Sequence, residues 1–119
     1  MIFVDVDGLK RINDRFGHRA GDDVLIEIAK LLSREVRTSD LVARLAGDEF
    51  GILLPCTNEL SAWHLAVRVV EAVADSEMIL SNTRQKLSVA VGVAEVTPDD
   101  TPQSVIERAD AAMYQIKRT

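Results

Sequence analysis

Acidic residues stand at two points where the chain changes direction. Asp48 and Glu49 lie between two apolar runs, residues 41–45 and 50–54, and Asp5 lies near the end of the apolar run that opens the chain. Carboxylate oxygens suit Mg²⁺, and Mg²⁺ held by only one or two carboxylates is typical of sites that bind a phosphate-bearing substrate. Taken alone, Asp48 and Glu49 indicate a solvated acidic turn, so the positions of the other elements decide between the two interpretations.

The two apolar runs predict a β-hairpin. Both contain strand-forming residues, and the short segment between them includes Gly47. Adjacent residues near a strand point to opposite faces, so at most one of Asp48 and Glu49 can aim at a given target. The predicted hairpin therefore carries carboxylates at its tip, where an Asn-Gly pair would be the usual choice.

The opening run, residues 1–7, predicts a strand that is covered on both faces. Asp5 and Asp7 share one side of this strand if it stays regular to its end. Gly8 then allows a tight turn into a short helix. Asp7 is best explained as the N-cap of that helix, whereas Asp5 precedes the turn and has no such explanation.

Apolar spacing and cap signals predict the remaining elements. In chain order they are a helix over Leu9–Phe16, a loop over 17–21, a helix over 24–36 capped by Asp22 or Asp23 with Arg37 in its last turn, the hairpin, a helix over 59–77, a polar connection over 78–85, a strand over 87–94, and a helix capped by Thr101 and started by Pro102.

This β-α-β-β-α-β order predicts an α+β fold, a ferredoxin-like or palm-type sandwich in which helices flank a central antiparallel sheet. In that topology the first strand is central and adjoins the hairpin, so Asp5 is expected beside the tip that carries Asp48. Two carboxylates ~4 Å apart repel by about 4 kcal/mol at an effective dielectric constant of about 20. The fold therefore predicts a cation, Mg²⁺ or Mn²⁺, between them.

Composition places limits on the partners. The chain has 119 residues, enough for a single domain, and its net charge of −5 argues against nucleic acid or an anionic membrane as the main partner. Its one cysteine, Cys56, cannot form an internal disulfide, which suits a reducing compartment. With no membrane-spanning run and no signal-peptide pattern, we expect a cytoplasmic domain, although a longer parent protein could be anchored in a membrane.

Several short motifs occur in a fixed order along nearly the whole chain. They are Asp5-Val6-Asp7-Gly8-Leu9-Lys10, Ile12-Asn13-Asp14, Gly17-His18, Gly21-Asp22, Arg44 with Gly47-Asp48-Glu49-Phe50, Val91-Gly92-Val93-Ala94, and Ala109-Asp110 with Ala112-Met113-Tyr114 and Lys117. Each motif is weak evidence by itself. In this order and at this spacing they resemble the GGDEF family, the diguanylate cyclases of bacteria.

The resemblance implies a metal site and a catalytic site. The family condenses two GTP molecules into cyclic di-GMP, and each domain of a homodimer presents one GTP to the other. By resemblance, Asp5, the Val6 carbonyl and Asp48 hold Mg²⁺ on the triphosphate, and Asp48 and Glu49 are the catalytic residues. Glu49 would be a metal ligand or would help to deprotonate the 3′-hydroxyl.

The resemblance also implies residues that bind GTP. Backbone amides at the start of the first helix would cradle phosphates, Lys117 would add a cation, and Asn13 and Asp22 would read the guanine edge. The alternatives are a surface role for Asn13 and a helix-cap role for Asp22. The full substrate-binding set is Gly8, Leu9, Lys10, Asn13, Asp22, Gly47 and Lys117.

A second site follows from Arg37-Thr38-Ser39-Asp40, which resembles the R-x-x-D of the inhibitory site at which the family binds its product, cyclic di-GMP. Arg68, on the following helix, matches a second arginine of that site. The alternative is a helix-end arginine, a turn aspartate and an unrelated surface arginine.

The chain departs from the family pattern in three places. Ala46 replaces the first glycine of the signature, which is unfavourable if that position needs a positive φ. The helix that precedes the first strand, with its D-x-L-T and N-R features, is absent, and the chain stops before the usual G-R-N. We therefore expect residues 1–119 to be one incomplete GGDEF domain, a fragment of a longer protein that has an open apolar face, associates through it, and binds GTP weakly.

Two functions are compatible with these features. The first is a diguanylate cyclase domain that uses GTP, Mg²⁺ and a second copy of itself. The second is a catalytically silent domain that binds GTP or cyclic di-GMP and regulates an attached domain of the parent protein, for example a phosphodiesterase. The intact acidic residues favour the enzyme, and Ala46 favours the silent domain.

Overall fold

The computed structural model describes the backbone of residues 1–118 and the side chains of residues 1–114. The molecule is elongated, with extents of 48 × 25 × 25 Å. Its elements in chain order are β1 (Ile2–Val6), α1 (Leu9–Phe16), α2 (His18–Glu35), β2 (Leu41–Ala46), β3 (Glu49–Leu53), α3 (Glu59–Ala74), β4 (Glu77–Leu80), β5 (Thr83–Lys86), β6 (Val89–Val93) and α4 (Pro102–Arg118).

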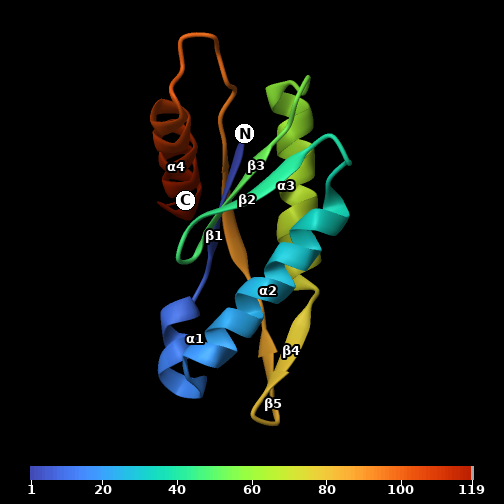
Figure 1. Cartoon of the computed structure of the whole chain (residues 1–119), viewed down its shortest axis with the longest axis vertical. Helices are drawn as coiled ribbons and strands as arrows, with labels where there is room; N and C mark the ends of the chain where they lie inside the picture. The colour runs from blue at the N-terminus through green and yellow to red at the C-terminus, as the bar shows by residue number, and fades with distance from the viewer. Residues whose placement is uncertain (119) are drawn as a thin grey trace.

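The main sheet has the strand order β2-β3-β1-β6, and every neighbouring pair is antiparallel. Helices α2 and α3 cover one face of this sheet, and α4 lies against the other (Figure 1). The predicted α+β sandwich is therefore confirmed, with β1 in the interior of the sheet beside the hairpin strand β3.

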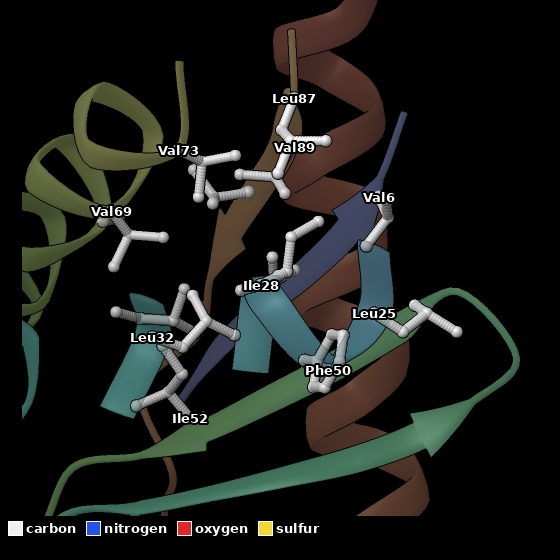
Figure 2. Close-up of a cluster of buried hydrophobic side chains, with 14 of the residues drawn as sticks. Val6, Leu25, Ile28, Leu32, Phe50, Ile52, Val69, Val73, Leu87 and Val89 are labelled. Carbon is white, nitrogen blue, oxygen red and sulfur yellow. The ribbon is translucent and has the colours of Figure 1, made fainter. Parts of the chain in front are cut away.

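The core has two parts because residues of β1 alternate between the two faces of the sheet. Ile2, Val4 and Val6 are buried in the larger cluster, whereas Phe3 is buried in a smaller cluster against α4. Figure 2 shows the larger cluster, in which Phe50 and Ile52 of β3 point toward side chains of α2. By the same alternation, Asp5 lies on the face that α4 covers.

A glycine lets α4 approach the sheet closely. A Cβ placed on Gly92 would lie 2.0 Å from the Ala109 carbonyl oxygen and 2.5 Å from the Met113 nitrogen, so no larger residue fits without displacing the helix. The missing side chain of Gly92 is therefore what permits the close approach of α4 to β6. It also brings Asp110, the residue after Ala109, close to the sheet.

The start of α2 differs from the expectation. The helix begins at His18 after Gly17, which has a φ of 94°, so Asp22 and Asp23 lie inside the helix and neither caps it. Gly21 lies inside the helix and faces Asn13 of α1, where only glycine fits because a Cβ would lie 1.7 Å from Asn13 Oδ1. At the other end α2 stops at Glu35, so Arg37 follows the helix and is not in its last turn.

The segment 78–85, predicted as a polar connection, is a second β-hairpin formed by β4 and β5. Its turn residues Ser81 and Asn82 have φ values of 49° and 65°, the left-handed pair that a tight hairpin turn requires. The ribbon projects from the end of the molecule near α2 (Figure 1). β4 contains the apolar run Met78-Ile79-Leu80 and β5 is entirely polar, so neither strand shows the apolar alternation that predicts a strand.

An apolar groove lies between the hairpin strands and α4. Leu41, Leu45 and Leu53 are exposed and line a cavity of about 400 Å³ together with Val105 and Ile106 of α4. Ile2, Phe3 and Val4 of β1 are buried, so the exposed apolar residues lie on the hairpin and α4 and not on the first strand. Association through an apolar face stays a prediction. No helix in the described part of the chain is long and apolar enough to cross a membrane.

Candidate functional site

The hairpin tip, residues 46–49, lies against the end of β1. Glu49 is the first residue of β3 and pairs with Asp5 in the sheet register. The Val6 amide donates a hydrogen bond to the Asp48 carbonyl, with N and O 2.8 Å apart. The structure thus brings Asp5, Val6, Asp48 and Glu49 together at one edge, as the topology predicted.

Four carboxylates interact electrostatically at this edge, and we call them the acidic cluster: Asp5, Asp48, Glu49 and Asp110. Burial raises the pKa of Glu49 above its usual range, and the charges of Asp48, Asp5 and Asp110 raise it further. The sequence assigned no role to Asp110, because helical spacing does not reveal how close α4 comes to β3. The signal that could have found it is Gly92 opposite Ala109.

The acidic cluster fits a cation that is completed by a substrate. Among the side chains that the structure describes, no three His, Cys, Asp or Glu converge closely enough to hold a metal ion by themselves. Mg²⁺ typically takes one or two carboxylates plus substrate phosphates and water rather than an all-protein cage. The Asp5 and Asp48 carboxylates and the Val6 carbonyl supply donors of this hard oxygen type.

The start of α1 is open to an anion. Gly8 occupies the N-cap with a φ of 70°, and no side chain caps the helix. Lys10 is exposed in the first turn, and Leu9 is half-buried against the core. The N-cap role expected for Asp7 is wrong, since the Asp7 carboxylate accepts a hydrogen bond from Ser88 Oγ at 2.9 Å. The first amides of α1 are thus free of any side-chain cap.

The proposed guanine-reading residues lie at the junction of α1 and α2. Asn13 Oδ1 is buried against Gly21 and accepts no hydrogen bond from the described part of the protein. Asp22 is exposed and directly follows Gly21. Asn13 and Asp22 are therefore neighbours. Gly47, at the hairpin tip, has open space where a Cβ would lie. The side chain of Lys117 lies outside the described residues.

Arg37, Asp40 and Arg68 line one cavity of about 270 Å³. Arg37 donates from Nε and Nη2 to the Asp40 carboxylate, which lowers the pKa of Asp40, and Nη2 also donates to Thr57 Oγ1 at 2.8 Å. Arg68 donates to the Glu35 carbonyl at 3.2 Å. These residues are thus gathered by the fold, although they come from different segments.

The fold and this edge of the sheet define a class: an α+β domain whose acidic hairpin tip adjoins the central strand and an uncapped helix start. The sequence matches the family described as diguanylate cyclase, GGDEF domain, over residues 1–119, and the chain belongs to that family.

Named relatives agree with this assignment. The chain is 40% identical to the diguanylate cyclase TpbB of Pseudomonas aeruginosa over 99% of its own length. It resembles the solved structure of the diguanylate cyclase SiaD of P. aeruginosa, in complex with its activator SiaC, with a TM-score of 0.91 and 37% identity over 98% of this chain and 45% of that one. The GGDEF domain of DgcB from Caulobacter crescentus, in complex with c-di-GMP, gives a TM-score of 0.89 and 30% identity over 98% of this chain and 70% of that one.

The relatives are longer proteins. The chain spans 28% of the length of TpbB, and between 11% and 32% of the length of the other curated relatives compared.

The acidic cluster makes a prediction about stability. We expect Glu49→Gln to raise the melting temperature at neutral pH, because the raised pKa of Glu49 shows that its ionised form is disfavoured by folding. The folded state then binds more protons than the unfolded state, so stability falls as the pH rises above the ordinary glutamate value of 4.5. The increase should be small, since salt screens a partly exposed group.

Thermal melts across this pH range test the prediction. The increase in melting temperature of Glu49→Gln should be full at a pH above the pKa of Glu49 in the folded chain. It should be absent below pH 4.5, where the wild-type carboxyl is already neutral. Glu71→Gln, at an exposed position of α3, removes the same charge away from the cluster and is the control. A gain that grows in acid would contradict the argument.

Proposed function

We propose that this chain is a diguanylate cyclase domain that condenses two GTP molecules into cyclic di-GMP with Mg²⁺ or Mn²⁺, across a dimer of domains. The observation that carries the proposal is the pairing of Asp5 with Glu49, reinforced by the hydrogen bond from Val6 to Asp48. It sets several half-buried carboxylates at one edge of the sheet, where a cation would relieve their mutual repulsion.

The reaction joins two nucleotides twice. In each step the 3′-oxygen of one GTP forms a bond to the α-phosphorus of the other, the bond from that phosphorus to the bridging oxygen breaks, and pyrophosphate leaves. When bound, the metal ion supplies positive charge at the triphosphate and lowers the pKa of the attacking hydroxyl. Asp5, the Val6 carbonyl and Asp48 would hold the ion. Glu49, whose pKa is raised, is suited to accept the hydroxyl proton.

The rest of the substrate would lie along α1 and α2. The uncapped amides that follow Gly8, with Lys10, would bind phosphate oxygens. Asn13 and Asp22 would bind the guanine edge at the junction of the two helices. Each step needs the 3′-hydroxyl of one nucleotide to face the α-phosphorus of the other, so a second copy of the domain would present the second GTP.

The backbone at Ala46 supports the enzyme over the silent domain. Ala46 is not among the residues with positive φ, so replacing the glycine of the signature causes no left-handed strain. Ala46 is also exposed and pairs with Glu49 in the sheet. Its methyl group therefore leaves the hairpin geometry intact.

The test is incubation with GTP and Mg²⁺, followed by mass spectrometry for cyclic di-GMP and pyrophosphate. It should be run on the longer parent protein and on the 119-residue chain, because the chain spans a minor part of its relatives. Product from the parent supports the proposal. Tight GTP or cyclic di-GMP binding without product from either would overturn it in favour of the silent domain.

The cavity at Arg37 is proposed to bind the product. We expect Arg37→Ala to weaken cyclic di-GMP binding roughly tenfold or more, because a hydrogen bond to a charged group contributes about 1.5–3 kcal/mol. The Arg37 side chain is 59% exposed, so its guanidinium can reach a ligand despite its contact with Asp40. GTP binding should be unchanged, since Arg37 is outside the acidic edge.

Calorimetry with each nucleotide measures both effects. Because Arg37 also holds Asp40 and Thr57, Arg68→Ala provides a second variant on the same cavity. Arg84→Ala, on the β4–β5 hairpin, is the matched control. Unaltered cyclic di-GMP binding in both cavity variants would leave Arg37 as a structural residue that holds the chain after α2.

A further inference from the structure

Arg44 holds the hairpin tip from within its own hairpin. It pairs with Phe50, and the register between β2 and β3 shifts between Arg44 and Ala46. The Arg44 side chain then donates from Nε to the Ala46 carbonyl at 3.2 Å and from Nη2 to the Gly47 carbonyl at 2.8 Å.

Together with β1, Arg44 engages three successive carbonyls of the tip. The carbonyls of Ala46 and Gly47 accept from Arg44, and the carbonyl of Asp48 accepts from the Val6 amide. The backbone that carries Asp48 and Glu49 is therefore tied on one side to a guanidinium and on the other to the central strand.

We propose that Arg44 is a positioning residue that fixes the hairpin tip so that Asp48 and Glu49 stay aligned with Asp5. The inference deepens the proposed function and rests on it for its catalytic consequence. Its structural part, the clamp on the tip, stands on the hydrogen bonds alone.

The tip needs such a clamp because packing does not hold it. Ala46 and Gly47 are exposed, and a Cβ built on Gly47 would meet no atom within 4 Å. Glycine also leaves the backbone free to rotate. The like charges of the acidic cluster push the tip away from Asp5. Hydrogen bonds from Arg44 fix the local conformation of the tip, and the hydrogen bond from Val6 opposes its displacement from β1.

The guanidinium is suited to this task by its shape. Its rigid fork presents two donors at a fixed separation, so it can span two neighbouring carbonyls at once. A lysine ammonium is a single centre on a flexible stem and cannot hold both carbonyls in the same way. Lys at this position therefore keeps the charge but loses the clamp.

Arg44 also lines a cavity with Asp22, Leu25 and Phe50, so a direct contact with the nucleotide is the competing explanation. The two roles differ in what they change. A positioning residue alters the order of the tip without any ligand, whereas a substrate-binding residue alters the KM for GTP.

The experiment compares Arg44→Gln and Arg44→Lys with wild type, and Arg84→Gln serves as a control on the distant β4–β5 hairpin. Hydrogen–deuterium exchange without ligand should show faster exchange of the Val6 amide and of residues 46–49 in both Arg44 variants. Exchange in α2 and α3 should be unchanged, which shows that each variant folds. This readout does not depend on catalysis.

Kinetics on the active parent protein supply the second readout. Residues that orient metal ligands typically cost 10–100-fold in metal affinity or activity. We expect the Mn²⁺ concentration for half-maximal turnover to rise roughly tenfold, and the KM for GTP at saturating Mn²⁺ to stay within about twofold.

The outcomes separate the two claims. Wild-type exchange at the tip in Arg44→Gln overturns the clamp, and so does full recovery of tip protection in Arg44→Lys. Faster exchange with an unchanged Mn²⁺ requirement and a raised KM overturns the positioning role in catalysis. Faster exchange in a protein whose wild type makes no cyclic di-GMP overturns the proposed function and leaves the clamp standing.

Discussion

Asp48→Asn should reduce Mg²⁺-dependent formation of cyclic di-GMP by roughly 10²–10³-fold, the size of effect seen when one preorganised electrostatic group is removed from an active site. Asn has nearly the same shape as Asp but lacks the charge that a hard cation requires. The fold should survive, because the hydrogen bond that ties Asp48 to β1 uses its backbone carbonyl. The loss should therefore appear in turnover and not in the melting temperature.

The measurement is a time course of cyclic di-GMP at saturating Mg²⁺, with circular dichroism to verify folding. Asp99→Asn is the matched control, since Asp99 is exposed in the loop before α4 and its replacement removes the same charge. Retained turnover in folded Asp48→Asn would exclude Asp48 from the metal and catalytic site. Equal losses in Asp48→Asn and Asp99→Asn would show that net charge alone is responsible.

The adjacency behind this prediction was accessible from the sequence because it depends on topology. Once residues 1–7 and the hairpin are recognised as strands, the β-α-β-β-α-β order sets β1 beside β3, and Asp5 must lie near the tip. Alternation along β1 then assigns Asp5 to the face opposite Val4 and Val6. No detail of side-chain packing is needed for either step.

Structural features that depend on close contacts between elements could not be predicted from the sequence in the same way. Gly17 and Gly21 look like loop residues by composition, yet Gly21 lies inside α2, and it is a glycine because Asn13 occupies the space that a side chain would need. The position of Asp110 depends on how near α4 comes to β6. Gly92 permits a close approach, but a glycine in the sequence does not by itself predict one. In the β4–β5 ribbon, β4 has three apolar residues in succession and β5 has none, so neither strand alternates between apolar and polar residues.

The effect of Ala46 could not be decided from sequence because it depends on one torsion angle. A positive φ would have made alanine costly, whereas the observed backbone accepts it. The hydrogen bond from Arg44 to the Ala46 carbonyl shows how this backbone is held. A signature residue can thus change without loss of geometry when its neighbours hold the chain in an ordinary conformation.

GTP should bind far more tightly than ATP, with discrimination that can reach roughly 10⁴-fold for a site built to hydrogen-bond one base. An Asp22 carboxylate can accept from both N1–H and N2–H of guanine. Adenine has no 2-amino group, and its N1 is itself an acceptor, so the carboxylate would face a lone pair. Asn13, whose Oδ1 is buried against Gly21, adds a second polar side chain at the junction of α1 and α2.

Calorimetric titration with each nucleotide and Mg²⁺ measures this discrimination directly. Asp22→Asn should lower it, because an amide can offer a donor to adenine N1 and repels guanine N1–H through the same donor. Asp23→Asn is the matched control: Asp23 is the next residue of α2, is also exposed, and points to a different side of the helix. Comparable affinity for ATP and GTP in the wild type would exclude Asn13 and Asp22 from the guanine-binding site. An equal loss of discrimination in Asp22→Asn and Asp23→Asn would show that Asp22 acts only through its charge.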